Sequence, residues 1–327
     1  MATQFGRFGN PVLIGAFALA LAALPALVHA GKDIQERRAA EPQGTVEIVG
    51  LAGTIEVNGW DRPEVEVTGT AGGEVERVDV NSAAGRTSIH VVTRSGLSGG
   101  EGQTRLAIRV PAGSSVTATL VTADVKVSGV QGDVNLRTVS GNVSGDVGGD
   151  LRANTVSGSV RMTAGKSRNI EVKTINGDIE LTGGAGEAAI TTVSGNAKIQ
   201  LGQLTRGRFK SISGQMTAGL SLAPGAQLEA ESISGTIRFD FSAAPAGDFD
   251  IQTLSGSIDS CFGPKPSESR YGPGSRLVFQ TGDGHARVRI ETKSGDVHLC
   301  TAGAHREHVA AGAAARTIAR WQIPYVI

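Results

Sequence analysis

The sequence has 327 residues, with 31 Lys and Arg against 31 Asp and Glu, so its formal net charge at pH 7 is zero. This balance gives no electrostatic footprint for nucleic acid, and we expect no nucleic-acid partner. Glycine occupies 46 positions while aromatic residues make up only 4%, a composition that disfavours a large compact core of bulky side chains.

Residues 1–30 have the features of a secretory signal peptide. Arg7 lies in a short charged region, an apolar run follows, and Val28 and Ala30 flank a cleavage site. We therefore expect export to the periplasm or the cell surface, and a mature chain that starts near Gly31. Retention of the apolar run as a membrane-spanning helix is the alternative, but a proline interrupts the run. No integral membrane segment is expected after cleavage.

Two segments precede the regular part of the chain. Residues 31–43 are expected to be a linker, and residues 44–120 an irregular N-terminal β region, because short runs rich in Val, Ile and Thr alternate with turn residues. The strands expected in this region cover residues 45–49, 54–57, 65–68, 87–93 and 105–110.

Residues 121–300 contain a repeat whose core is a tetrad of Thr or Ser, an aliphatic residue, Ser or Asn, and Gly. Successive tetrad glycines are separated by 17, 19, 18, 19, 21 and 21 residues, and the last interval of 39 is about twice the others. The turn glycines are Gly141, Gly158, Gly177, Gly195, Gly214, Gly235, Gly256 and, in a degenerate copy, Gly295.

The residues around each tetrad glycine alternate between apolar and polar, as expected for strands with one buried face. Ile170 and Val172 precede Gly177, and Ile179 and Leu181 follow it. The tetrad Thr shares the parity of the preceding strand, whereas the aliphatic residue shares the parity of the following strand, so the chain must bend between them. We expect the Thr/Ser hydroxyls to satisfy backbone groups at an interior corner; an exposed ice- or glycan-binding hydroxyl array is the alternative.

One coil of this kind cannot bury its own apolar face, but coils stacked one strand spacing apart can. The sequence therefore predicts an all-β fold: a β-helix or solenoid of short two-strand coils with Ser-Gly turns and parallel pairing between equivalent strands. The turn glycine would supply a backbone conformation, or a close approach, that a Cβ forbids.

The long interval decides the state of the two cysteines. Cys261 and Cys300 each lie five residues after a tetrad glycine, so in adjacent coils they would be about 4.8 Å apart and could form a disulfide. Segment 262–275 is expected to be a loop ejected from the coils, which allows this structural bond. If residues 276–280 instead belong to a full extra coil, two free thiols remain. Residues 301–327 are expected to be a C-terminal tail.

Two further motifs carry a resemblance to a known family. They are Gly-Thr-Ile-Glu-Val-Asn-Gly-Trp-Asp at residues 53–61 and Leu-Ala-Ile-Arg-Val-Pro-Ala-Gly at residues 106–113. Together with the Ser-Gly turns, they resemble the bacterial "putative adhesin" family of β-strand-repeat proteins over about residues 44–300. The resemblance implies a β-solenoid in an envelope setting, and it carries over no catalytic residues.

Candidate sites for chemistry are few. Glu229 and Asp250 are expected to stack as neighbours in an outward column, but that column mixes charges of both signs and favours a solvated surface. The glycine-rich segment 183–187 is expected to be a loop rather than a calcium site, and His305 and His308 lack a third metal ligand in the tail. We expect no catalytic residue, metal or cofactor.

These observations favour a non-enzymatic structural or adhesive binding module of the bacterial cell envelope, whose partner is an envelope protein or a glycan. One alternative is a carbohydrate-active β-helix enzyme, which would require an acidic cluster flanked by exposed aromatic residues. The other is a periplasmic sensor or assembly partner of a membrane complex.

Overall fold

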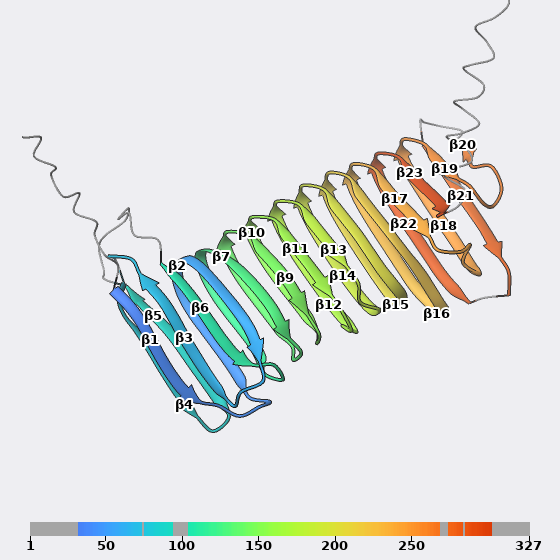
Figure 1. Cartoon of the computed structure of the whole chain (residues 1–327). Coiled ribbons are helices and arrows are strands. Elements are labelled where there is room, and N and C mark those ends of the chain that lie inside the picture. The colour runs from blue at the N-terminus through green and yellow to red at the C-terminus, as the bar shows by residue number, and fades with distance from the viewer. Residues whose placement is uncertain (1–31, 74, 94–103, 269–273, 284, 303–327) are drawn as a thin grey trace, which may run out of the picture. The chain divides into compact units, whose positions relative to one another are not determined.

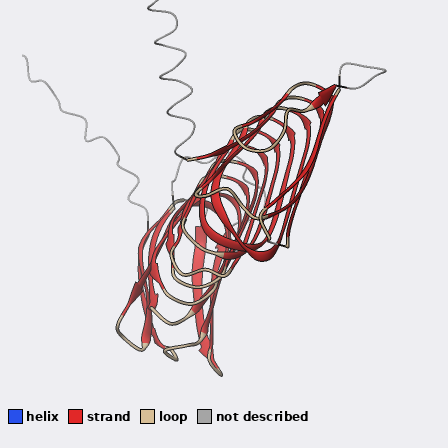
Figure 2. Ribbon diagram, turned by 90° about the vertical axis from the view of Figure 1, so that its right-hand side faces the viewer, coloured by secondary structure: helices blue, strands red, loops and turns tan. Residues whose placement is uncertain are grey.

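The computed structural model describes residues 32–73, 75–93, 104–268, 274–283 and 285–302. Figure 2 shows that these residues are strands and connecting turns without a helix, which confirms the expected all-β class. The expected signal peptide (residues 1–30), part of the expected loop (269–273) and most of the expected tail (303–327), with His305 and His308, lie outside the described residues.

The described ranges contain no helix that is long and apolar enough to cross a membrane.

Strands of successive repeats lie side by side in two ladders (Figure 1). The first ladder contains the strand before each tetrad: β8 (Val134–Ser140), β10 (Leu151–Ser157), β12 (Asn169–Asn176), β14 (Gly186–Ser194), the later parts of β15 (Ala197–Ser213) and β16 (Met216–Ser234), β22 (Ala286–Ser294) and β18 (Gly247–Ser255). The second contains the strand after it: β9 (Val143–Val147), β11 (Val160–Ala164), β13 (Ile179–Thr182), the early parts of β15 and β16, β17 (Ile237–Phe241), β23 (Val297–Thr301) and β19 (Ile258–Ser260).

In-register parallel pairing turns the apolar alternation into buried columns between the two ladders. Ile170 on β12 pairs with Leu151 on β10 and with Ala188 on β14, and all three side chains are buried. Because each coil exposes its apolar face until the next coil covers it, the stack as a whole forms one continuous core.

The coils do not follow the chain order at the C-terminal end. Strand β22 lies between β16 and β18, and β23 lies between β17 and β19. The last coil in the sequence is therefore inserted between the two coils that precede it in the chain. The chain reaches this position through β20 (Ser267–Glu268) and β21 (Ser275–Thr281), and β21 ends the first ladder by pairing antiparallel with β18. The prediction of a loop over residues 262–275 is therefore partly wrong, because residues 267, 268 and 275 are in strands.

The N-terminal end is arranged in the same way. Strand β2 (Thr45–Trp60) contributes to both ladders and pairs with β7 (Ser115–Val130), while the later segments β5 (Arg86–Thr93) and β6 (Arg105–Pro111) pair on its outer side. Antiparallel strands then complete the end: β4 (Val75–Ala83) on β5, β3 (Glu64–Ala71) on β6, and β1 (Lys32–Ala39) on β3.

Two expected boundaries change as a result. The linker expected over residues 31–43 contains strand β1, whose backbone pairs along the whole length of β3. The expected boundary at residue 120 falls inside β7, which runs through both ladders as a regular coil.

The tetrad glycines have the left-handed backbone that only glycine adopts easily, with φ between +130° and +155° at all eight positions. At Gly195 a Cβ atom would lie 2.3 Å from the carbonyl oxygen of Gly177 in the neighbouring coil. Stacked glycines therefore allow successive corners to approach at strand spacing.

Cys261 and Cys300 are joined by a disulfide, with their Cα atoms 4.9 Å apart. The sequence predicts the disulfide if segment 262–275 is an ejected loop, and two free thiols if an additional strand is present. The structure contains the additional strand β21 and also the disulfide. Both occur because the coil that carries Cys300 returns beneath the coil that carries Cys261, so the two coils are neighbours.

Candidate binding surface

The aliphatic residue of the tetrad points to solvent in the described coils. In spatial order, the column consists of Val121, Val139, Val156, Ile175, Val193, Ile212, Ile233, Lys293 and Leu254, and we call it the aliphatic ladder. Its large apolar members are 40–69% exposed, except for Val193, which is half-buried. Isolated exposed aliphatic residues are ordinary, but a contiguous column of them indicates an interaction surface.

The outward direction of the aliphatic ladder corrects the prediction from parity, which grouped these residues with the apolar face of the following strand. The neighbouring Thr or Ser turns inward, as the sequence predicted, and is 1–5% exposed in all eight repeats. The left-handed glycine interrupts the regular strand, so the alternation of buried and exposed residues cannot be continued across the turn.

The inward hydroxyls satisfy the turn backbone in only some coils. Thr138 donates to the carbonyl of Ser140 at 3.1 Å, and Thr253 donates to the carbonyl of Gly295 at 3.1 Å. Thr174 donates to the Gly158 carbonyl at 3.3 Å. Five others have no hydrogen-bond partner among the described residues: Thr155, Thr192, Ser211, Ser232 and Thr292. Burial of this column excludes it as an exposed hydroxyl array.

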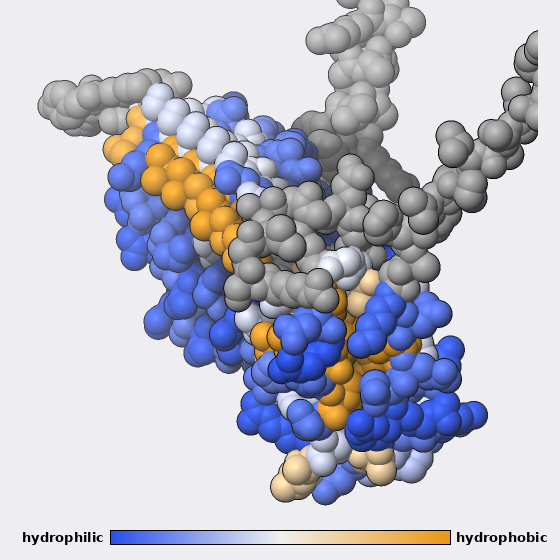
Figure 3. Space-filling view, turned by 90° about the vertical axis from the view of Figure 1, so that its left-hand side faces the viewer, coloured by the Kyte–Doolittle hydropathy of each residue, from blue (hydrophilic) through white to orange (hydrophobic). Residues whose placement is uncertain are grey.

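A groove of about 550 Å³ runs beside the aliphatic ladder in the later coils. Val193, Ile212, Ile233 and Leu254 form its apolar side. The opposite side is an outward column four residues before each glycine, which we call the polar column; here it consists of Thr191, Lys210, Glu231, Glu291 and Gln252. Figure 3 shows a line of hydrophobic residues, in orange, beside a paler line of residues of intermediate hydropathy.

The outward column six residues before each glycine does not contain the expected acid pair. Arg289 on the inserted strand β22 pairs in register with Glu229 on one side and with Asp250 on the other. Glu229 also contacts Arg208 at 3.3 Å, and Asp250 contacts Arg276 at 3.2 Å. The prediction that Glu229 and Asp250 are neighbours is wrong, because it assumed that the coils stack in chain order.

The polar residues just after the glycines form a column of hydrogen bonds between successive coils. The Oδ1 atom of Asp178 accepts the backbone N–H of Asn196 at 2.8 Å, and Oδ1 of Asn196 accepts that of Gln215 at 3.1 Å. Asp296 accepts the backbone N–H and the hydroxyl of Ser257, and these hydrogen bonds lower the pKa of its carboxyl below the ordinary range. These side chains bind neighbouring coils to one another.

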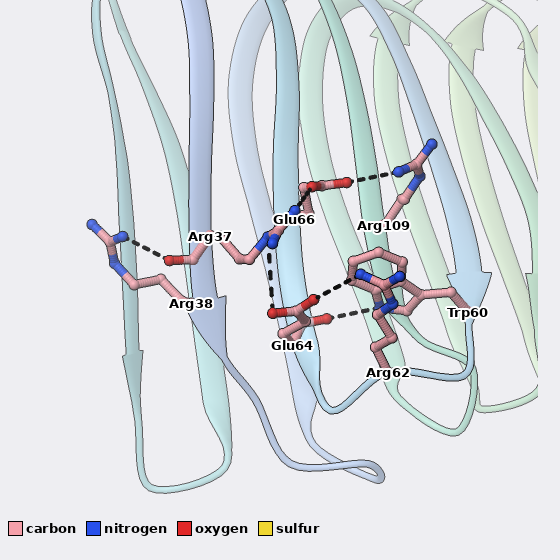
Figure 4. A network of polar contacts seen from close by, with 7 residues as sticks. All are labelled: Arg37, Arg38, Trp60, Arg62, Glu64, Glu66 and Arg109. Carbon is pink, nitrogen blue, oxygen red and sulfur yellow. Dashed lines mark hydrogen bonds and ion pairs between the residues drawn. The ribbon is translucent and has the colours of Figure 1, made fainter.

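A second polar cluster, shown in Figure 4, holds the N-terminal strands together. Glu66 on β3 has a side chain only 7% exposed and accepts hydrogen bonds from Arg37 on β1 and from Arg109 on β6, the latter at 2.8 Å. The hydrogen bond from Arg37, more than any other contact, keeps the pKa of Glu66 below its usual range. The guanidinium groups of Arg62 and Arg109 lie 5.3 and 5.7 Å from the Trp60 ring centroid.

The other motifs give no site in the described part of the chain. Gly183, Gly184 and Gly186 form the turn into β14, and Glu187 pairs with Arg206 at 3.3 Å. Among the residues with described positions, no group of three or more His, Cys, Asp and Glu is placed to hold a metal ion.

The family model described as Toastrack DUF4097 matches residues 45–300. Among solved structures, a "putative adhesin" from Bacteroides fragilis is 10% identical, with 82% of this chain and 97% of that chain covered and a TM-score of 0.38. A "putative adhesin" from Parabacteroides merdae is 10% identical, with 82% and 96% covered and a TM-score of 0.31. A "putative lipid binding protein" from Parabacteroides distasonis is 11% identical, with 82% and 98% covered and a TM-score of 0.29. No curated protein matches.

Proposed function

This chain belongs to the Toastrack DUF4097 family, and we propose that it is a non-enzymatic binding module of the bacterial cell envelope. Its stacked repeats form a two-strand β-helix that displays the aliphatic ladder as its binding surface. The N-terminal segment directs export, and the module acts in the periplasm or on the cell surface. The partner is an envelope component, either a protein or a glycan with an apolar face.

The exposure of the aliphatic ladder is the observation that carries this proposal. Neighbouring outward columns have structural partners: the residues after the glycines hydrogen-bond to adjacent coils, and Glu229 and Asp250 are paired with arginines. The aliphatic ladder has no such role, because its side chains are largely outside the core. Burial of apolar area gives a favourable free energy of about 25 cal/mol per Å², and here this gain is left for a partner.

Quantitative capture from envelope fractions tests the proposal. The full chain is compared with a ladder variant, Val156→Thr/Ile175→Thr/Ile212→Thr, and with a control variant, Arg161→Thr/Glu180→Thr, whose exposed ion pair lies on the outward face of the second ladder. We expect an envelope component other than the chain itself to be retained by the wild type and the control and lost from the ladder variant. Equal retention by all three proteins would contradict the proposal.

An assay of product release tests the non-enzymatic character. We expect no reducing ends and no unsaturated sugars when the protein is incubated with envelope polysaccharides. Product formation that disappears in Glu229→Gln or Asp250→Asn would support the carbohydrate-active enzyme instead.

A further inference from the structure

We infer that the aliphatic ladder also packs against the same ladder of a second copy of this chain, with the two ladders antiparallel. This inference rests on the proposed binding surface and names a partner for it. Three properties of the described residues support a second copy: the spacing of the ladder, its extent and the distribution of charge beside it.

The spacing of the ladder is set by β pairing, with one side chain per coil at about 4.8 Å. From Val121 to Ile233 the ladder holds seven consecutive Val or Ile residues without a charge. These β-branched side chains have few rotamers, so the ladder is rigid and its knobs and gaps recur regularly. A second copy has the same period, and its side chains can therefore contact those of the first copy coil by coil.

The extent of the surface matches a stable interface. Over the same seven coils, the ladder is flanked by the polar column and by a column of small residues just before the glycines, such as Ser157 and Ser213, which are exposed. An antiparallel two-fold axis between the Ile175 and Val193 coils pairs eight coils, from the Val121 coil to the Lys293 coil, and three columns over eight coils supply 24 residues, within the range of about 20–30 residues that a standard interface of about 800 Å² per partner contains. A self-complementary surface of this kind is what a two-fold dimer requires.

The charges in the polar column determine the direction. Arg137, Lys173 and Lys210 are in the earlier coils, whereas Glu231 and Glu291 follow in later coils. When two ladders meet face to face and antiparallel, each polar column lies against the other in reversed order, so its basic part faces the acidic part of the second copy. In a parallel arrangement each polar column would face the uncharged Ser column.

One two-fold position pairs opposite charges and sets six of the seven Val or Ile residues against one another, while Val121 faces Lys293. An axis between the Ile175 and Val193 coils places Val139 opposite Ile233 of the second copy, and Arg137 opposite its Glu231. With this axis Lys173 faces Thr191 of the second copy, and Lys210 faces its Asn154. Like charges therefore do not meet in the polar columns.

The aliphatic ladder and the charged residues of the polar column have different roles in the association. No ion pair among the described residues involves Arg137, whereas Glu231 already contacts Lys210 at 2.9 Å. Exposed ion pairs add little affinity but discriminate between orientations. The ladder therefore supplies the affinity, and the charges select the antiparallel direction.

Sedimentation velocity and light scattering of the purified full chain, over a range of concentrations, measure the association. We expect a reversible dimer. The ladder variant Val156→Thr/Ile175→Thr/Ile212→Thr should weaken it at least 100-fold, because each substitution occurs twice in the interface, and the control Arg161→Thr/Glu180→Thr should leave it unchanged. Equal melting temperatures at concentrations where both proteins are monomeric establish that the ladder variant remains folded, as expected for side chains that are 40–45% exposed.

Charge reversal tests the direction. Arg137→Glu and Glu231→Arg should each weaken the dimer, and the double variant should restore it. A protein that stays monomeric up to the millimolar range, or a dimer unaffected by the ladder variant, would overturn the inference; a double variant no better than the single ones would overturn the antiparallel arrangement. A monomer that still captures an envelope component through the ladder would leave the proposed function standing while this inference fails.

Discussion

At the scale of single residues, sequence parity identified most of the buried positions. Ile170, Val172, Ile179 and Leu181 point into the core as the alternation around each glycine predicted. The exposed aliphatic residue was missed because alternation holds only while the backbone remains a regular strand, and the turn glycine at φ near +140° interrupts it. A recurring turn glycine that requires a left-handed backbone indicates, in the sequence itself, that the alternation cannot be continued past it.

Replacement of a turn glycine should be costly at a site such as Gly195. We expect Gly195→Val to lower the free energy of unfolding by about 2 to 6 kcal/mol, because backbone strain and overpacking each contribute about 1 to 3 kcal/mol. The new Cβ would lie 2.3 Å from the Gly177 carbonyl oxygen. Chemical denaturation measures the change, and Gly73→Val is the control because a Cβ there meets nothing within 4 Å. Similar losses in both variants would contradict a special role for the turn glycine.

Glu66 should make stability depend on acidity. Its pKa is lowered in the folded chain, so its stabilising contribution is present above the pKa of the unfolded chain and is lost as pH falls through the lower folded-state pKa. Melting temperatures measured between neutral pH and about pH 2 should therefore fall less steeply at the acidic end for Glu66→Gln than for wild type. The control Glu187→Gln removes an exposed ion pair with Arg206. Identical acid profiles for Glu66→Gln and wild type would show that the cluster with Arg37 and Arg109 is unimportant.

At the scale of elements, the repeat predicted the strands but not their order. Tetrad spacing gives the register within a coil, and the register observed between Gly256 and Gly295 is the expected one. Spacing contains no information on which side of a coil the next one pairs, because both sides present the same unpaired backbone groups. The 39-residue interval was the only signal of the change at the C-terminal end, and the insertion of β22 and β23 resolves it.

Truncation should reveal the inserted coil. We expect a chain that ends after Gly282, and so lacks β22 and β23, to lose hydrogen-exchange protection at β18 and β19 as well, because β22 and β23 connect these strands to the rest of the ladders. A chain that lacks only residues 303–327 should keep that protection. Full-length Cys300→Ser controls for the missing disulfide. Retained protection of residues 247–260 in the chain that ends after Gly282 would mean that these strands pair elsewhere.

At the scale of the whole array, antiparallel strands close both ladders at the N-terminal end and the first ladder at the C-terminal end. Parallel ladders leave unpaired backbone at each end, which favours end-to-end association. Strand β21 covers β18, and β3 covers β6 and is itself covered by β1. The repeats predicted the array, but the N-terminal strands were expected as an irregular region and a linker, because antiparallel pairing of distant segments has no repeat signature in the sequence.

Strand β1 should limit association to the dimer proposed above. Its charged residues, Lys32, Asp33, Glu36, Arg37 and Arg38, discourage further pairing at the outer edge. Deletion of residues 32–39 exposes the edge of β3, an alternating strand that includes the buried Val65 and Val67. We therefore expect the deleted chain to form species larger than a dimer as its concentration rises, measured by light scattering.

Loss of the Arg37 ion pair also accompanies this deletion, so Arg37→Gln in the full chain is the matched control. That variant keeps the backbone pairing between β1 and β3, while it removes the hydrogen bond to Glu66. It should be less stable than wild type without forming larger species. If Arg37→Gln associates as strongly as the deletion, loss of the ion pair rather than an open strand edge is responsible, and the capping role of β1 is wrong.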